Sequence, residues 1–226
     1  MDSVCKFVSA KRRSKKRIYL CFDEWNVWYK NHQLDTTKGK FPYHMLEEIY
    51  NLEDALVVAG FLNSFIRHAN CLKIANLAQI VNVIAPIITK EDDILIQSIF
   101  YPFEMISKRK EGISLRFYIE GPYYESKSYG NVNHIDASFI LGEGKLNAFV
   151  LNRYFKEEVL INPSDFEILS LENAEILTGP EPKAKNSFEK KDLIVSKEFK
   201  GINVSKGKAI FKLPPFSFSA ITFKIL

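Results

Sequence analysis

The chain has 226 residues, which at roughly 150 residues per domain allows one large domain or two small ones and excludes a whole eight-stranded α/β barrel of about 250 residues. The sequence is 46% hydrophobic, 26% charged and 13% aromatic with only 10 Gly and 9 Pro, which excludes a disordered or low-complexity polymer. The net charge of +4, from 31 basic and 27 acidic side chains, comes mostly from one basic run.

This basic run is expected to be a solvated connection between a helix and a strand, because no groove-reading or base-stacking motif accompanies it. We therefore expect no nucleic-acid partner. The run consists of Lys11, Arg12, Arg13, Lys15, Lys16 and Arg17.

The cysteines and the apolar runs indicate the compartment. Cys5, Cys21 and Cys71 are an odd number and form no CxxC pair, which is typical of a reducing environment. The first ten residues lack the apolar run of a signal peptide, and no stretch approaches the roughly 18 apolar residues of a membrane span. The sequence predicts a soluble, cytoplasmic protein without a membrane partner.

The first half of the chain reads as alternating helices and strands. Apolar residues recur at helical spacing on either side of two short apolar runs. Glu47, Glu48 and Asp54 lie near the expected start of the long helix, where carboxylates favour the helix dipole. The elements are helices over residues 1–10, 46–69 and 97–108, the last interrupted by Pro102, and strands over 18–22 and 72–78. Such strand, helix, strand units predict parallel pairing with the helices outside.

The second half reads as short strands separated by Gly and Pro. The expected strands cover residues 114–120, 132–141, 145–151, 166–171, 208–213 and 219–226. Strands at this spacing predict an antiparallel sandwich of the jelly-roll kind, with Phe117, Phe139, Phe149 and Phe211 competing for its interior. The predicted fold is α/β plus all-β, divided into residues 1–112 and residues 113–226.

A dense polar and aromatic segment, FDEWNVWY at 22–29, follows the first strand. In parallel α/β layouts functional groups are displayed at the carboxyl end of a strand. Strict alternation places Ile18, Leu20, Phe22 and Glu24 on one side, so Glu24 continues the row that would point into a barrel mouth. Aromatic rings beside a carboxylate suit a sugar. The plainer alternative is that the aromatic residues pack the next helix and that Glu24 caps it.

The second strand also ends in polar side chains, Gln79 and Asn82, and a buried amide there would need hydrogen-bond partners that a ligand hydroxyl can supply. Other chemical motifs are weak. The four His residues form no metal-binding pair, and the GEGK segment at 142–145 lacks the spacing of a phosphate loop. We expect no metal and no cofactor.

The motif FDEWNVWY closely resembles the nucleophile motif of the alpha-L-arabinofuranosidases of glycoside hydrolase family 51. The resemblance spans essentially the whole chain, and its first motif is highly specific. It continues through YNLEDALVVAGFLNSFIRHA at 50–69, KIANLAQIVNVIAPI at 73–87, QSIFYPF at 97–103 and the tail LPPFSFSAITFKIL.

The resemblance implies a set of roles for these residues. Enzymes of this family retain the anomeric configuration, and the Glu of DEWN is their nucleophile, which here is Glu24. Gln79 is similar to a residue that hydrogen-bonds the arabinose, and Trp28 matches an aromatic residue that lines the same pocket. Asn26 is assigned to this pocket and to support of its loop, and Asp23 and Trp25 are further supporting residues.

The resemblance also implies what the chain lacks. The family fold is a (β/α)8 barrel followed by a β-sandwich, and this chain corresponds to the last two barrel strands, their helices and the sandwich. The family's acid/base glutamate has no counterpart here, so the isolated chain is expected to be a poor enzyme. Either an internal Met has become a start, or a second polypeptide supplies the rest; the completed enzyme is expected to be a homo-oligomer acting on arabinose-containing oligosaccharides.

A second class of function remains open: a noncatalytic carbohydrate-binding or scaffold role through the sandwich. Its candidate residues are Tyr118, Tyr123, Tyr124 and Tyr129, although tyrosines in such segments more often pack in the core or in turns.

Overall fold

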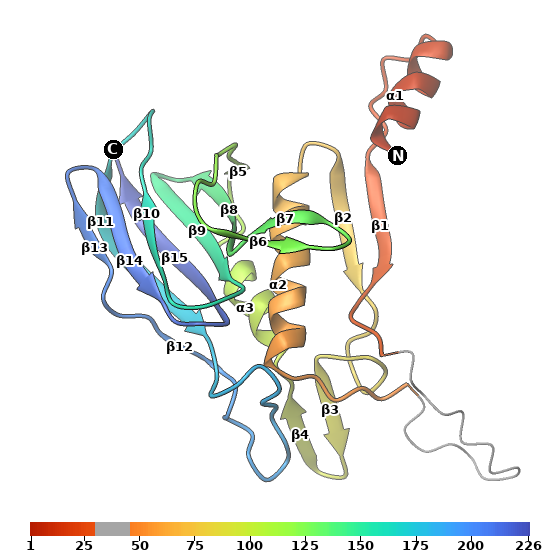
Figure 1. The fold of residues 1–226 in the computed structure, drawn as a ribbon. Helices are drawn as coiled ribbons and strands as arrows, with labels where there is room; N and C mark the ends of the chain where they lie inside the picture. Colours follow the sequence, from red (N-terminus) through yellow and green to blue (C-terminus); the bar gives the residue numbers. More distant parts are fainter. Residues whose placement is uncertain (30–45) are drawn as a thin grey trace, which may run out of the picture.

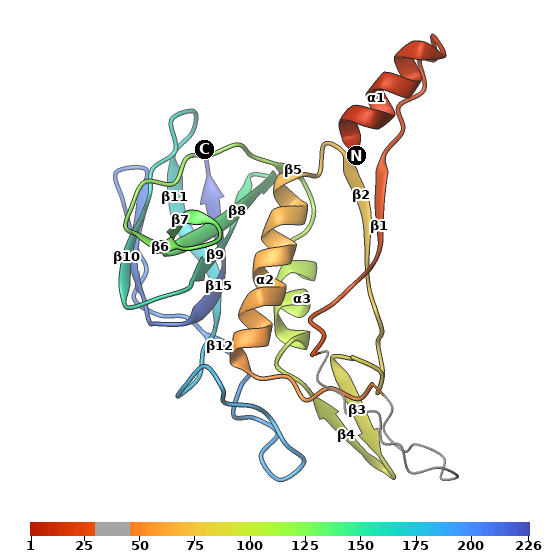
Figure 2. The ribbon, with the colours of Figure 1, turned by 45° about the vertical axis from the view of Figure 1, so that its right-hand side comes forward.

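The first half of the computed structural model, which describes residues 1–29 and 46–226, pairs two strands in parallel beside helices (Figure 1). Strand β1 (Leu20–Trp25) pairs with β2 (Leu72–Leu77). The remaining elements are α1 (Asp2–Lys11), α2 (Leu52–Arg67), β3 (Ile87–Lys90), β4 (Asp93–Ile96) and α3 (Phe100–Ser107). Helix α1 buries no residue and stands away from the body in both ribbon views (Figure 2).

The second half is built from antiparallel strands, which confirms the expected sandwich. A six-stranded sheet has the order β12-β11-β15-β9-β8-β5, and a three-stranded sheet has the order β10-β14-β13. The strands are β5 (Ile113–Ser114), β6 (Tyr123–Ser126), β7 (Gly130–Asn133), β8 (Ile135–Gly142), β9 (Lys145–Asn152), β10 (Glu157–Ile161), β11 (Ile168–Leu177), β12 (Ser196–Glu198), β13 (Asn203–Ser205), β14 (Lys208–Leu213) and β15 (Ser217–Ile225). Strands β6 and β7 form a separate hairpin.

The six-stranded sheet has a buried core on each of its faces. Leu146, Ala148 and Val150 of β9 belong to the core between the two sheets. Phe149 and Leu151 of the same strand belong to a second core, which contains side chains of α2 and α3. Successive residues of a strand point to opposite faces, so β9 is buried almost throughout.

The four expected interior phenylalanines therefore divide between the two faces of the sheet. Phe211 lies in the core between the sheets, and Phe117 and Phe139 pack at its border. Phe149 lies against the helices instead, because its neighbours in β9 occupy the inter-sheet side. The second core contains residues from both sides of residue 112, so the boundary between 1–112 and 113–226 stays a prediction.

Helix α2 begins six residues later than the sequence predicts. Asn51 caps it, with the Asn51 side chain accepting from the Asp54 N–H at 3.2 Å and the Asp54 carboxylate accepting from the Asn51 N–H at 2.8 Å. This reciprocal capping box ends the preceding extended segment. Glu47 and Glu48 therefore precede the helix, and only Glu53 and Asp54 lie in its first turn.

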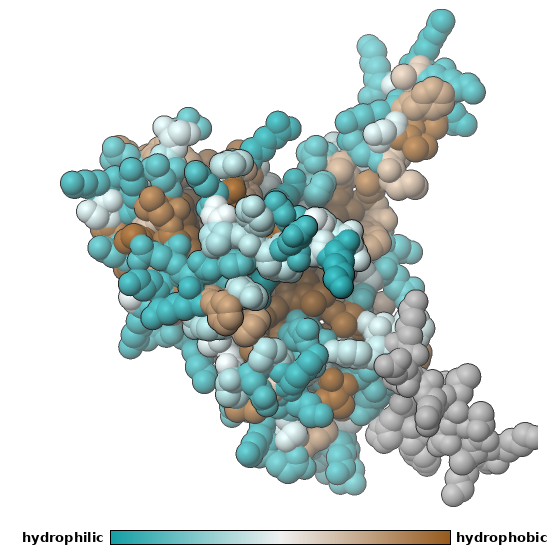
Figure 3. Space-filling view, viewed as in Figure 1, coloured by the Kyte–Doolittle hydropathy of each residue, from teal (hydrophilic) through white to brown (hydrophobic). Residues whose placement is uncertain are grey.

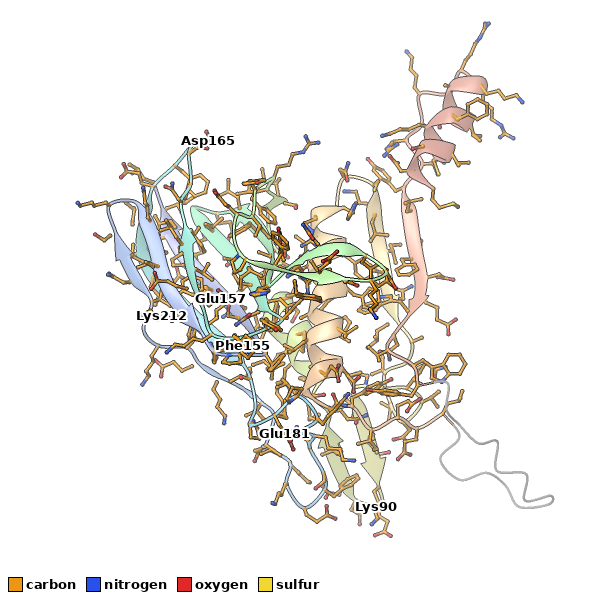
Figure 4. The ribbon with its side chains drawn as sticks, in the orientation of Figure 1. Lys90, Phe155, Glu157, Asp165, Glu181 and Lys212 are labelled. Carbon is orange, nitrogen blue, oxygen red and sulfur yellow. The ribbon has the colours of Figure 1, made fainter. Side chains whose placement is uncertain are left out.

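Helix α3 also differs from the expectation. It begins at Phe100 and runs without interruption through Pro102, which lies in its first turn, where a missing N–H breaks no intrahelical hydrogen bond. A hairpin of β3 and β4, which the sequence does not predict, lies between β2 and α3 in chain order. Lys90 marks its tip in Figure 4.

Several strand boundaries in the second half differ as well. The strand expected over 114–120 is reduced to β5, β10 was missed, and β11 extends to Leu177 rather than ending at 171. Strand β11 has five consecutive exposed residues near its start. Its apolar and polar residues therefore do not alternate in the way that predicts a strand.

A polar cluster ties α2 to the sandwich sheet. The Asp136 carboxylate of β8 accepts from Asn63 Nδ2 at 3.1 Å and forms an ion pair with Arg67 at 2.9 Å. Ser138 donates to Asn63 Oδ1 at 2.8 Å, and Arg153 lies 3.6 Å from the same carboxylate. Because Asn63 is fully buried, these partners satisfy groups that would otherwise be costly to bury.

Candidate active site

The strand β1 carries its aromatic side chains toward α2. Phe22 contacts Phe65 at a ring-centroid distance of 5.6 Å, and Trp25 contacts the same ring at 4.9 Å and stacks on Phe103 at 5.6 Å. In a regular strand, residues three apart point to opposite faces, so Phe22 and Trp25 can share a face only where the regular alternation is interrupted. The β1–β2 register shifts between these two residues.

The register shift corrects the expected row of side chains. Phe22 faces the helix and not the space in which a barrel interior would lie, so the row of Ile18, Leu20, Phe22 and Glu24 is not continuous. Glu24 precedes the buried Trp25 and is itself exposed, which places it on the face opposite the helices.

The loops that follow β1 and β2 are joined by hydrogen bonds. Ala78 N–H donates to the Trp25 carbonyl at 3.1 Å. The Asn26 side-chain amide donates to the Ala78 carbonyl at 2.9 Å and to the Ile84 carbonyl, and its own oxygen accepts from Val27 N–H at 2.8 Å. These bonds hold the residue after Glu24 against the residue before Gln79; the Ala78–Gln79 peptide is cis.

A buried amide beneath these loops connects three segments. Gln97, 1% exposed, donates to the Glu48 carbonyl at 2.9 Å and to the Ala85 carbonyl at 2.7 Å, and accepts from Tyr50 N–H at 2.8 Å. The Tyr50 hydroxyl then donates to the Val27 carbonyl at 2.7 Å. The backbone after Glu24 is thus held by Tyr50 as well as by the loop that follows β2.

The far end of the first loop is held at the start of α2. Tyr29 N–H donates to a Glu48 carboxylate oxygen at 3.1 Å, and the Tyr29 hydroxyl donates to the Asp54 carboxylate. Burial and the Asp54 charge raise the pKa of the Tyr29 phenol well above its usual range. Burial also raises the pKa of the Asp54 carboxyl, although the Tyr29 hydroxyl and the Asn51 N–H oppose this rise.

The six residues predicted from the sequence fall into two groups. Four are exposed at the ends of the two strands: Asp23, Glu24, Trp28 and Gln79. The Glu24 carboxylate accepts no hydrogen bond within the described part of the chain, and Trp28 is 49% exposed. The other two are enclosed: Trp25 is buried among aromatic rings, and the Asn26 amide is occupied by backbone carbonyls. Glu24 therefore does not cap the following helix, which Asn51 caps.

Asp23 has a neighbour of its own on β1. Its carboxylate lies 3.7 Å from the Cys21 thiol. Desolvation and this carboxylate raise the pKa of the thiol, so Cys21 stays protonated at neutral pH. Cys5, Cys21 and Cys71 are all free.

Sequence reasoning missed Tyr50 and Gln97. Both lie in segments with several apolar neighbours, where the pattern predicts helix and says nothing about a buried amide. The local pattern offered one signal, the isolated Gln that follows the apolar residues 94–96, and both residues begin motifs that carry the family resemblance.

Other features of the described residues add no chemistry to this site. Residues 1–29 and 46–226 contain no group of three His, Cys, Asp or Glu side chains that could hold a metal ion, and none of their helices is long and apolar enough to cross a membrane. A hollow of about 430 Å³ lies elsewhere, where α3 meets the six-stranded sheet, and its lining includes Lys108, Arg109, Glu143 and Glu175.

The family model for the alpha-L-arabinofuranosidase C-terminal domain matches residues 23–217. The chain belongs to this family. A relative from Bacillus subtilis (strain 168) is named intracellular exo-alpha-(1->5)-L-arabinofuranosidase 1. It is 36% identical to this chain, and the match covers 98% of this chain and 45% of the relative. A relative of the same kind from Acetivibrio thermocellus is 39% identical over 70% of the chain and 33% of its own length.

Solved structures agree with the family assignment. A family 51 alpha-L-arabinofuranosidase from Bifidobacterium longum superimposes with a TM-score of 0.86 at 26% identity, over 98% of this chain and 45% of that one. A family 51 arabinofuranosidase from Xanthomonas axonopodis pv. citri has the same fold, with a TM-score of 0.82 at 23% identity over 99% of this chain and 45% of that one. The chain thus spans less than half the length of these relatives.

Proposed function

We propose that this chain carries the nucleophile half of a retaining alpha-L-arabinofuranosidase that releases terminal arabinofuranosyl residues from arabinose-containing oligo- and polysaccharides in the cytoplasm. The observation that supports this most is the Asn26 bridge, which holds the loop of Glu24 to the loop of Gln79. An exposed carboxylate, an exposed amide and an exposed indole at the ends of two parallel strands are the groups that a furanose ring requires.

In this proposal Glu24 attacks the anomeric carbon and forms a covalent glycosyl-enzyme intermediate, and the departing oxygen takes a proton from a second carboxylic acid. Gln79 hydrogen-bonds the sugar, and Trp28 offers a stacking face. Asn26 serves as a positioning residue because its amide is already occupied, and Asp23 and Trp25 support the loop. Retention requires the two carboxyl groups to be about 5 to 5.5 Å apart.

The second carboxylic acid would come from a polypeptide that supplies further barrel strands. Both outer edges of the β1–β2 sheet are unpaired within the described residues. Its face opposite the helices exposes Ile74 at 51%, and α1 exposes Phe7 at 67%. Figure 3 shows hydrophobic side chains on α1 and in the middle of the same face of the molecule, where α2 runs. Unpaired strand edges and exposed apolar side chains favour association.

The proposal is tested by complementation. The chain is combined with the part of the Bacillus subtilis relative that it does not cover, and hydrolysis of an aryl arabinofuranoside is measured. Glu24→Gln should lower turnover by at least about 1,000-fold, because the isostere keeps the shape and removes the attacking charge. Glu198→Gln, at an exposed position on β12, is the matched control and should retain full turnover.

A chemical rescue separates a nucleophile from a merely positioning carboxylate. With Glu24→Ala, added azide should attack the anomeric carbon in place of the carboxylate, expel the aryloxide and give a glycosyl azide of inverted configuration. Turnover of the Glu24→Gln complex above one tenth of the wild-type value, or an azide product of retained configuration, would contradict the assignment.

A further inference from the structure

The β6–β7 hairpin is an arm on the sandwich that the proposed active site does not use. Figure 1 shows it along its length and Figure 2 shows it nearly end-on, so it projects from the body of the molecule. Tyr123 pairs with Asn133, Tyr124 with Val132, Glu125 with Asn131 and Ser126 with Gly130.

The register sorts these residues onto two faces. Directly opposed residues of an antiparallel pair share a face, and alternate residues of one strand do so too. Tyr124 faces the body, since its ring stacks on His134 at a centroid distance of 6.2 Å and on Tyr154 at 6.0 Å. The outer face therefore carries Tyr123, Glu125, Asn131 and Asn133.

The base of the arm is held firmly. His134 N–H donates to the Pro122 carbonyl at 3.0 Å, and Arg153 donates to the Asn133 carbonyl at 3.2 Å. His134 Nδ1 lies 2.7 Å from the carboxylate of Glu157, which is labelled in Figure 4. Because these contacts fix the base, less of the hairpin has to be ordered when a ligand binds, which lowers the entropic cost of binding.

We propose that the outer face of the β6–β7 hairpin binds an oligosaccharide of the α-(1→5)-linked arabinan type, at a site separate from the one around Glu24. Tyr123 is 57% exposed and offers a ring face for the apolar side of a sugar. The exposed Glu125 and Asn131 stand two residues farther along the strands, about 7 Å away, where their oxygens and amide can bind the hydroxyls of the next sugar unit.

The composition of this face favours a sugar over a protein partner. Protein interfaces have a desolvated apolar centre. The outer face has one aromatic ring surrounded by two side-chain amides and a carboxylate, which is the mixture that an uncharged polyhydroxylated ligand needs. The choice of arabinan among sugars rests on the proposed function.

The test uses the ¹⁵N-labelled full chain and linear α-(1→5)-arabinopentaose as the probe. Saturable amide shifts should appear at residues 123–125 and 131–133. Tyr123→Ala should weaken this response at least tenfold, because it removes the stacking face, whereas Tyr123→Phe should preserve it. Tyr19→Ala, which removes a 50% exposed tyrosine outside the hairpin, is the control and should leave the affinity unchanged.

The outcomes distinguish this site from the proposed active site. Binding at the hairpin should persist in Glu24→Gln, so a failed nucleophile assignment leaves it intact. An unchanged response in Tyr123→Ala, or no shift at the hairpin amides, would overturn the proposal. So would a change in self-association of the chain caused by Tyr123→Ala, because it would mark the outer face as a protein contact.

Discussion

The side-chain amide of Asn26 donates to the carbonyl oxygen of Ala78 at 2.9 Å, one residue before Gln79, and its second hydrogen is directed to Ile84. Asn26→Ala would leave these two carbonyls without their donor. We expect a loss of about 1–3 kcal/mol in the free energy of unfolding, measured by urea denaturation. In the complemented enzyme the same variant should raise KM and lower kcat, because Gln79 would lose its fixed loop.

The control for this prediction is Asn76→Ala. Asn76 is exposed on β2, and its side chain forms no hydrogen bond within the described residues. Its removal should therefore change the unfolding free energy by no more than about 0.5 kcal/mol. Equal effects of the two variants would show that the bridge from Asn26 does not stabilise the loops.

The Asp136 carboxylate holds α2 on the sandwich, since it contacts Asn63, Arg67 and Arg153. Asp136→Ala would leave the buried Asn63 amide without its acceptor and two guanidinium groups without their counter-charge. We expect a loss of about 3–5 kcal/mol in the free energy of unfolding, measured by urea denaturation at low temperature. Glu158→Ala removes an exposed ion pair with Lys212 and should cost less than about 1 kcal/mol. Similar losses would contradict a clamp at Asp136.

Gly112 allows the chain to pass from α3 into the sandwich sheet. Its φ of +133° is unfavourable for other residues, and a Cβ atom there would lie 2.3 Å from the Leu141 carbonyl oxygen. Gly112→Ala should therefore destabilise the fold by at least about 1–3 kcal/mol, seen as a lower thermal midpoint. Gly121→Ala, at a position with open space around it, should leave the midpoint unchanged within about 1 °C. A similar change in both variants would exclude a steric cause.

The ion pairs of the Glu175 carboxylate should make the folded chain less stable in acid. Burial opposes its charge, but the Arg109 guanidinium at 2.7 Å outweighs burial and, with Lys108, lowers the pKa of Glu175 below its usual 4.5. A carboxyl whose pKa is lower in the folded state stabilises the fold above pH 4.5, and this contribution is lost as the pH falls through the folded pKa.

Glu175→Gln should therefore lower the free energy of unfolding at pH 7 by about 1 kcal/mol, a value reduced by partial exposure. Between pH 5 and 3 its stability should fall less steeply than that of the wild type. Urea denaturation at several pH values measures both effects. Glu198→Gln, which removes an exposed pair with Lys200, should keep the wild-type slope, and a wild-type slope in Glu175→Gln would contradict the prediction.

The sequence predicted those elements whose pattern is local. The strand after Leu72 and the helix face of Leu56 and Ala59 follow from spacing alone. The start of α2 could not be found in this way, because residues 46–51 continue the apolar spacing of the helix, and only the capping box at Asn51 ends the extended segment.

The residue types of the candidate site come from the sequence and stay a prediction, and its geometry could not be predicted. The motif at 22–29 marks Glu24, yet alternation placed Phe22 on the wrong face, because a register shift leaves no signature in residue types. Phe149 was assigned to the wrong core for a related reason. A strand that is buried on both faces loses its alternation, so the sequence cannot tell which sheet face each side chain occupies.

The exposed face of β2 gives a prediction about assembly. Ala75 and Leu77 pack toward the aromatic cluster around Trp25, so Ile74, which precedes Ala75 in the strand, points to the opposite side and is 51% exposed. Ile74→Lys replaces apolar surface by a charge without touching that cluster. The free energy of unfolding should change by no more than about 0.5 kcal/mol, and the isolated chain should self-associate less in sedimentation experiments.

The same variant should no longer be complemented. A lysine would have to be buried without a partner when further barrel strands pack on β2, which costs several kcal/mol, so arabinofuranosidase activity of the mixture should fall at least tenfold. Leu169→Lys, at a 53% exposed position on β11, is the matched control and should leave complementation intact. Full complementation by Ile74→Lys would show that this face stays in water, and the proposed partner would then have to bind elsewhere on the chain.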